Sequence, residues 1–255
     1  MLNLAIFYGG KSAEHDISII TAIQVIRNLN KGKYNVTPIF IDENNVWHVL
    51  DDYLNLNIYA NKEYKGVELA SGFFNGCLVK KSMLGFKKFK KIDIAINSMH
   101  GLNGEDGTLS GLLELNNIPY VGSGVLASSV GMDKVIQKDV LRANGLPVAR
   151  YIYFNEVDYT DNEQLFIKKV EENIGYPVVV KPANLGSSIG INISKNREDL
   201  IKNIKIALNY DKKVIIEEQI LNLREINCSV LGNYKHTEIS ILEEPKNWKT
   251  FLDFN

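Results

Sequence analysis

The sequence has little of what marks a disulfide-rich, membrane-spanning or nucleic-acid-binding protein. Its 255 residues include two cysteines, Cys77 and Cys228, which stand apart without the spacing of a metal site or a disulfide framework. The formal net charge of -1 gives no electrostatic reason to expect a nucleic acid or a membrane surface as partner. No apolar run approaches the roughly 20 residues of a membrane span, and no signal peptide is recognisable. We therefore expect a cytoplasmic protein.

The first half of the chain has the alternating strands and helices of an α/β domain. Ser18 is the expected N-cap of its first helix. Five apolar residues at helical spacing are expected to face the core: Ile19, Ile20, Ile23, Ile26 and Leu29. The predicted elements are, in order, a strand over 3–8, this helix, strands over 34–41 and 92–98, a helix over 108–116, a strand over 118–121 and a helix over 133–143.

The middle of the chain is less clear than its second half. Between residues 42 and 91 no period stands out, and the basic run 86–91 is interpreted as a solvated approach to the next strand rather than a binding patch. Beyond residue 150 the pattern predicts a compact β-α-β-β-α-β layer of the α+β type. Its strands are expected over 151–154, 178–181, 189–193 and 213–217 and its helices over 162–173 and 197–208, followed by one more strand over 225–231.

Tight polar turns are concentrated in residues 98–134, which read SMHGLNGEDGTLSGLLELNNIPYVGSGVLASSVGMDK. Glycine this dense lets backbone amides approach a bound anion or a small polar substrate. His100 follows a predicted strand, where α/β sheets place ligand contacts, although a structural role is the alternative. Glu105 and Asp106 are interpreted chiefly as turn formers that cap the following helix.

The opening loop contains a second candidate, Glu14. Between a strand and a helix, its carboxylate can meet the ammonium group of an amino acid or interact with the dipole of the helix, and both interpretations stay open. The nearby run Gly10-Lys11-Ser12 looks like the end of a phosphate-binding P-loop. Ala5 stands where that motif requires glycine, so we exclude a P-loop.

An anion site is also indicated in the second half. Residues 186–190 form a Gly/Ser-rich loop between two predicted strands, and its amides and hydroxyls can bind an anion, although a plain hairpin turn is the alternative. Lys134 and Lys181 offer point charges for phosphate oxygens. Residues 217–221 follow a strand, where an exposed backbone edge can hydrogen-bond an adenine.

Taken in order, these segments resemble the D-alanine–D-alanine ligases, ATP-dependent enzymes of the ATP-grasp superfamily. The matching stretches are GGKSAEHDIS, MHGLNGEDGTLSG, IPYVGSGV, MDK, VVKPANLGSSIG, VIIEEQ and REINCSVLG. Three departures lie near the site: Ser110 replaces a usual glutamine, Leu223 a usual glycine and Gln219 a frequent lysine. The resemblance implies a Rossmann-like substrate-binding domain over 1–126, an ATP-grasp small subdomain with its phosphate loop over 127–217, and the beginning of the large subdomain over 218–255.

The resemblance implies ATP-dependent ligation of two D-alanines through an acyl phosphate, for peptidoglycan and cell-wall synthesis. It places Glu14 and Ser187 together in a catalytic hydrogen-bonded set and His100 beside the carboxylate of the first substrate. The implied ATP contacts are Lys134, Lys181, Gly186, Ser187, Ser188, Glu218, Gln219, Ile220, Leu221 and Glu225. The partners are then D-alanine and ATP, with two Mg²⁺ ions in the complete fold, and a homodimer is a family expectation.

Relatives continue beyond the point that corresponds to residues 248–255. Their further segment contains a Lys-Tyr loop, an arginine, an Asp…Glu-x-Asn set that holds two magnesium ions, and a serine at the second substrate. We therefore expect the metal ligands to lie outside this sequence, as in a C-terminally truncated ligase. Two alternatives stay open: a truncated, non-catalytic ATP-binding module, and a ligase that forms D-Ala-D-lactate or D-Ala-D-serine.

Overall fold

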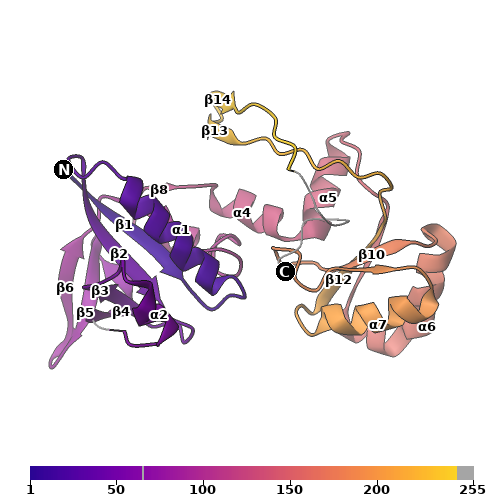
Figure 1. Ribbon diagram of the computed structural model, residues 1–255, viewed down its shortest axis with the longest axis horizontal. Helices are drawn as coiled ribbons and strands as arrows, with labels where there is room; N and C mark the ends of the chain where they lie inside the picture. Colours follow the sequence, from indigo (N-terminus) through magenta and orange to yellow (C-terminus); the bar gives the residue numbers. More distant parts are fainter. Residues whose placement is uncertain (65, 246–255) are drawn as a thin grey trace. The chain divides into compact units, whose positions relative to one another are not determined.

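The computed structural model describes residues 1–64 and 66–245, which form two compact units, Met1–Gln137 and Lys138–Asn255 (Figure 1). The division falls inside helix α5 (Lys134–Ala143). The domain boundaries expected after residues 126 and 217 fall inside α4 (Val125–Met132) and β12 (Lys213–Glu218). In the described part of the chain, no helix has the length and apolarity to cross a membrane.

The first unit is built on an eight-stranded sheet of order β6-β5-β4-β3-β2-β1-β7-β8. Its strands are β1 (Leu2–Gly9), β2 (Tyr34–Ile41), β3 (Trp47–Leu50), β4 (Gly66–Phe74), β5 (Cys77–Ser82), β6 (Gly85–Lys91), β7 (Ile94–Asn97) and β8 (Tyr120–Val121). Its helices besides α4 are α1 (His15–Asn28), α2 (Leu56–Ala60) and α3 (Thr108–Leu115). Strands β2, β1, β7 and β8 are parallel, as an α/β domain requires, whereas β3 to β6 are antiparallel to their neighbours.

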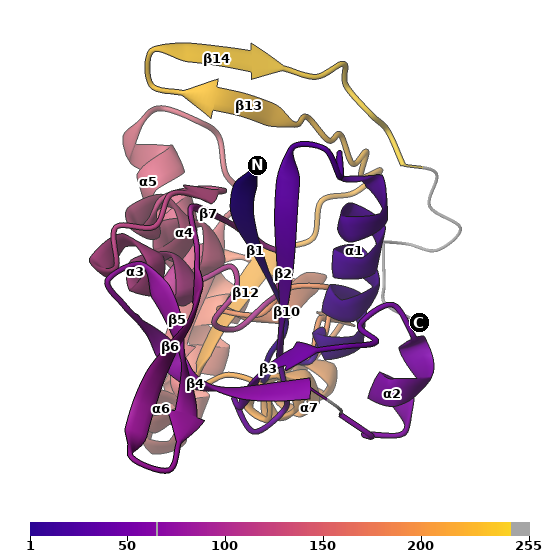
Figure 2. The same ribbon diagram turned by 90° about the vertical axis from the view of Figure 1, so that its left-hand side faces the viewer.

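Strand β1 is buried on both faces because a separate core covers each of them. Leu4, Ile6 and Tyr8 pack in the cluster that contains α1, which lies beside β1 and β2 in Figure 2. Ala5 and Phe7 point into the opposite cluster, which contains α3. This alternation follows from the two-residue period of a strand, and burial of both faces is typical of parallel sheets.

Residues 42–91, where the sequence showed no clear period, form an antiparallel extension of the sheet. The turn from β2 to β3 depends on Asp42, whose carboxylate accepts backbone N–H groups of Asn44 and Val46 at 2.8 and 2.9 Å. The interpretation of 86–91 as an approach to a strand was wrong, because these residues belong to the edge strand β6. Lysine is common at such edges, and it masked the strand pattern.

The beginning of α1 also differs from the prediction. Glu14 is the N-cap residue, and Ser18 lies one turn inside the helix, fully buried. Its hydroxyl accepts the backbone N–H of Gly9 at 2.7 Å and donates to the backbone carbonyl of Ser98 at 2.9 Å. Ile20 is exposed rather than in the core, because the buried face of the helix contains Ile19, Ile23 and Ile26.

The second unit contains the predicted β-α-β-β-α-β layer. Its elements are β9 (Tyr151–Asn155), α6 (Glu156–Asn173), β10 (Val178–Pro182), β11 (Asn192–Ser194), α7 (Arg197–Leu208) and β12. The strands pair antiparallel in the order β11-β10-β12-β9, and α6 and α7 cover one face of this sheet (Figure 1). The strand predicted over 225–231 begins too early: only its last two residues are in a strand, β13 (Val230–Asn233), which pairs with β14 (His236–Ile239) in an exposed hairpin.

Removing the Ser18 hydroxyl tests its role in the first unit. We expect Ser18→Ala to lower the free energy of unfolding of this unit by about 2–3 kcal/mol, because two buried backbone groups lose their partner. The measurement is urea denaturation. The control is Thr160→Ala, which removes an exposed hydroxyl bonded to the Glu156 carbonyl and should cost less than about 0.5 kcal/mol. Equal effects of the two substitutions would contradict this assignment.

Candidate functional sites

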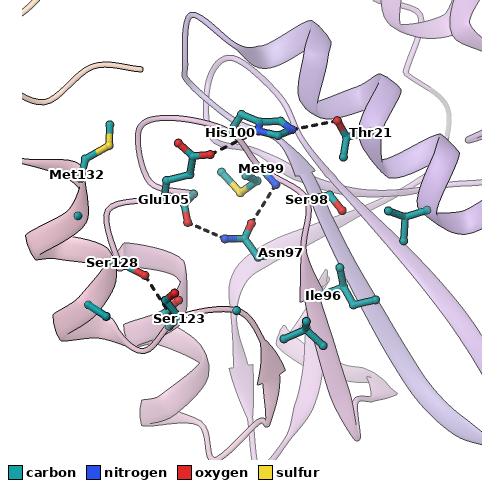
Figure 3. A pocket seen from close by; sticks show the side chains of 17 residues that line it. Thr21, Ile96, Asn97, Ser98, Met99, His100, Glu105, Ser123, Ser128 and Met132 are labelled. Atoms are coloured by element: carbon teal, nitrogen blue, oxygen red, sulfur yellow. Dashed lines mark hydrogen bonds and ion pairs between the residues drawn. The ribbon is translucent and has the colours of Figure 1, made fainter. Parts of the chain in front are cut away.

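The first unit contains a cavity of about 510 Å³ at the carboxyl end of β7 (Figure 3). Parallel α/β sheets place ligands at this end, so the position agrees with the expectation for His100. The walls come from α1, from the turn after β7 and from α4, which the sequence analysis did not predict. The lining residues are Thr21, Val25, Ile96, Asn97, Ser98, Met99, His100, Gly104, Glu105, Ser110, Val121, Gly122, Ser123, Ala127, Ser128, Gly131 and Met132.

The imidazole of His100 is held from both sides in this cavity. Its Nε2 lies 3.0 Å from the hydroxyl oxygen of Thr21, and its Nδ1 lies 3.5 Å from a carboxylate oxygen of Glu105 (Figure 3). Glu105 therefore pairs with His100 rather than capping a helix. Asp106 does form the turn, because its carboxylate accepts the backbone N–H groups of Asn103 and Thr108, each at 2.9 Å.

Glu14 lies next to the turn formed by His100 and Gly101, against the backbone of the glycine. Gly101 has a φ of +69°, and a Cβ atom there would lie 2.5 Å from Glu14 Oε2 and 2.6 Å from Ser12 Oγ. The carboxylate is therefore packed directly against the Gly101 backbone, and Glu14 as a whole is only 6% exposed. The structure thus brings two of the predicted site residues, Glu14 and His100, to adjacent positions around one turn.

The second unit has its own cavity of about 380 Å³. Seven of the ten residues predicted to contact ATP line it: Lys181, Ser188, Glu218, Gln219, Ile220, Leu221 and Glu225. The other lining residues are Val179, Ile191, Ile193, Glu217, Asn222 and Leu223. Lys181 and Glu225, which are 44 positions apart in the sequence, therefore line the same cavity, because β10 pairs with β12 and Glu225 follows β12.

The apolar part of this cavity follows from the alternation of β10. Val178 and Val180 point into the core with α6 and α7, so Val179 and Lys181 face the other way. In the register of the sheet, Val179 lies opposite Ile193 on β11 and Glu217 on β12. Sequence reasoning missed Val179, although the period of the strand already placed it on the same face as Lys181.

Two ammonium groups share a single buried carboxylate at the polar end of the cavity. Lys181 Nζ lies 2.8 Å from Glu217 Oε2, and Lys138 Nζ lies 3.3 Å from Glu217 Oε1. The Glu217 side chain is 7% exposed, and a carboxylate this buried is favourable only when it is paired. Lys138 was missed by sequence reasoning. The signal was its position one helical turn after Lys134 in α5.

The next carboxylate, Glu218, has a different partner. Its Oε1 accepts the backbone N–H of Arg150 at 2.8 Å, and its Oε2 accepts Arg150 Nε at 2.7 Å. These hydrogen bonds, the backbone one first, hold the pKa of Glu218 below its ordinary value.

The remaining predicted residues lie outside these two cavities. Gly186 and Ser187 belong to the loop between β10 and β11, where Ser187 and Ser188 have φ values of 50° and 57°. Lys134 and Glu14 belong to the first unit and Lys181 and Ser187 to the second, so both expected pairings across the units stay predictions. Over residues 1–64 and 66–245 no group of three or more His, Cys, Asp or Glu side chains could hold a metal ion.

Comparison with protein families decides the relationship. Residues 3–123 match the family described as "D-ala D-ala ligase N-terminus", and residues 140–255 match "D-ala D-ala ligase C-terminus". The chain belongs to the D-alanine–D-alanine ligase family. It has the ATP-grasp fold of that family, as the resemblance implied.

Individual ligases of this family agree over most of the chain. The D-alanine–D-alanine ligase of Bacillus velezensis is 44% identical over 229 residues, which cover 89% of this chain and 64% of the relative. That of Thermosipho africanus is 40% identical over 259 residues, covering 100% and 68%. The chain therefore spans about two thirds of the length of these relatives.

Solved ligase structures superpose closely. The D-alanine–D-alanine ligase of Helicobacter pylori has a TM-score of 0.83 at 30% identity, covering 97% of this chain and 76% of the other. The VanG D-Ala:D-Ser ligase of Enterococcus faecalis has a TM-score of 0.82 at 29% identity, covering 100% and 72%.

The close approach at Gly101 yields a prediction about the position of the Glu14 carboxylate. We expect Gly101→Ala to displace the Glu14 carboxylate and to destabilise the first unit by about 1–3 kcal/mol, because alanine is strained at this φ and its Cβ meets two oxygen atoms. Urea denaturation and a structure of the variant measure both effects. Gly124→Ala is the control, since no atom lies within 4 Å of its added Cβ. Unchanged stability and an unmoved carboxylate in Gly101→Ala would refute the proposed packing.

Proposed function

We propose that the protein is an ATP-dependent ligase that joins two D-alanines to D-alanyl-D-alanine through an acyl phosphate, in peptidoglycan precursor synthesis. The observation that carries this proposal is the cavity of the second unit. Seven residues that the sequence resemblance assigned to ATP binding line this one cavity. The names of the relatives at about 40% identity support the choice of D-alanine. The VanG relative keeps D-serine open as an alternative second substrate.

The residues of the second cavity fit an adenine nucleotide. Val179, Ile191 and Ile193 offer apolar surface to a flat base, and the backbone that follows β12 offers hydrogen-bonding groups at its edge. Glu225 is assigned to the ribose. Lys181 supplies a positive charge for phosphate oxygens, and Lys138 lies beside the same carboxylate.

The residues of the first unit suit an amino-acid substrate. The Glu14 carboxylate is assigned to the ammonium group and His100 to the carboxylate of the first D-alanine. Thr21 and Glu105 hold the imidazole in place at its two ring nitrogens, so a substrate carboxylate would replace one of these two partners. Lys134, Gly186, Ser187 and Ser188 complete the assignment as further contacts to the phosphates, with Ser187 also in the catalytic set with Glu14.

The protein contributes positioning and charge rather than a nucleophilic side chain, as phosphoryl transfer requires. The loop over 186–190 is assigned to exclude water from the reactive acyl phosphate. Magnesium neutralises phosphate charge in such reactions, and its ligands are expected outside the described residues. Two free cysteines and the use of ATP favour the cytoplasm, and the homodimer of the family remains the expectation for assembly.

The two cavities predict a division of labour that substitutions can separate. We expect Lys181→Ala to abolish measurable ATP binding, whereas Glu14→Gln leaves ATP affinity within about twofold and impairs the use of D-alanine, because the charges serve different ligands. Calorimetric titration with ATP measures the first effect, and the dependence of phosphate release on D-alanine concentration measures the second. Equal loss of ATP affinity in both variants would rule out this division.

The decisive experiment measures ATP-dependent phosphate release by the expressed protein with D-alanine alone, with D-alanine plus D-serine, and with D-alanine plus D-lactate. We expect release with D-alanine alone, together with formation of the dipeptide. Faster release only with D-serine or D-lactate would assign the corresponding alternative ligase. ATP binding without any phosphate release would instead favour a non-catalytic ATP-binding module.

A further inference from the structure

The two consecutive acids at the end of β12 are committed to different cations. The Glu217 carboxylate faces Lys181 and Lys138, whereas the Glu218 carboxylate is bound by Arg150. Neighbouring residues of a strand point to opposite faces, so each acid meets the cations of its own side. Both residues line the cavity of the second unit, but their carboxylates do different things there.

Arg150 holds the chain at Glu218 through three hydrogen bonds and makes a fourth to Asn173. Besides its two contacts to the carboxylate, its backbone carbonyl accepts the N–H of Glu218 at 3.0 Å. Its guanidinium Nη1 in turn donates to the backbone carbonyl of Asn173 at 3.0 Å. The next residue, Gln219, donates its backbone N–H to the Pro177 carbonyl at 3.3 Å. The segment that leaves β12 is thus tied to Arg150, just before β9, and to Pro177, just before β10, while Arg150 is itself held by the end of α6.

This arrangement assigns the Glu218 side chain to the protein rather than to a ligand. Both of its oxygens already accept a hydrogen bond from Arg150, so the group left to face the cavity is the backbone. An Arg–carboxylate pair this exposed contributes little to stability, since the Arg150 side chain is 62% accessible. One contact comes from the Arg150 backbone N–H and the other from its side chain, so together they fix the direction of the chain.

We propose that Arg150 is a positioning residue for recognition of the nucleotide base: through Glu218 it fixes the backbone of residues 218–221 along the cavity wall. The inference rests on the proposed binding of ATP to this cavity. The hydrogen bonds of Arg150 hold the end of β12 and do not involve Lys181. They therefore affect contacts to the base and leave contacts to the phosphates unchanged.

Two ligands separate these contributions. AMP carries the base with a single phosphate, and tripolyphosphate carries the phosphates with no base. In calorimetric titrations of the full chain, we expect Arg150→Ala to weaken AMP about tenfold, as the loss of a well-placed hydrogen bond would, and to leave tripolyphosphate within about twofold. Lys181→Ala should weaken tripolyphosphate more than AMP. Arg150→Lys should recover part of the AMP affinity, because it restores the positive charge beside Glu218 without the Nε hydrogen bond.

A matched control is available in the same unit. Arg197 forms a comparable pair, with Nη1 3.2 Å from Glu171 Oε2, and also contacts Gln164, but none of these residues lines the cavity. Arg197→Ala should change the affinity for AMP less than about twofold while costing similar thermal stability. Loss of AMP affinity in Arg197→Ala equal to that in Arg150→Ala would overturn the proposal.

The remaining outcomes are equally decisive. Unchanged AMP affinity in Arg150→Ala, or equal weakening of AMP and tripolyphosphate, would overturn the positioning role while leaving ATP binding intact. If the unsubstituted chain bound neither ATP nor AMP, the proposed nucleotide site would be wrong, and so would the role of Arg150. Thermal unfolding of each variant confirms that the compared proteins are folded.

Discussion

A single buried hydroxyl in the first unit joins three segments that lead to the candidate residues Glu14 and His100. Ser18 connects the end of β1, the first turn of α1 and the end of β7. The loop that carries Glu14 lies between the first two segments, and the His100 turn follows the third. Because the hydroxyl both accepts and donates, it satisfies two backbone groups that would otherwise be buried without a partner. Ser18 therefore anchors in the core the chain segments that lead to Glu14 and to His100.

In the second unit, sheet pairing and side-chain alternation play the same part. Val178 and Val180 are buried in the core against α6 and α7. Because side chains of a strand alternate between its two faces, Val179 and Lys181 point into the cavity. The end of β12 then divides two adjacent carboxylates between Lys181 and Lys138 on one side and Arg150 on the other. A cavity with an apolar wall and one charged end results from these constraints, and both properties suit a nucleotide.

The sequence was informative wherever one physical signal dominated. The layer after residue 150 was predicted because its helices and strands carry clear periods, and seven of the residues that the resemblance assigned to ATP line one cavity. Ser18 was assigned as a cap because serine favours that position, but its long-range bonds to Gly9 and Ser98 prevailed. The pairing of Lys138 and Arg150 with their carboxylates could not be predicted, since the partners lie 79 and 68 residues away in the sequence.

The edge strand β6 has a consequence for how copies of this molecule meet. The outer side of a terminal strand offers unpaired N–H and C=O groups, onto which another chain could add and so extend the sheet without limit. Lys87, Lys88, Lys90 and Lys91 are crowded along this border, and Lys88 and Lys90 lie over the rings of Phe74 and Phe89, at 5.0 and 5.8 Å. Two such borders repel each other, so the positive charge that conceals the strand in the sequence also disfavours edge-to-edge pairing of two molecules.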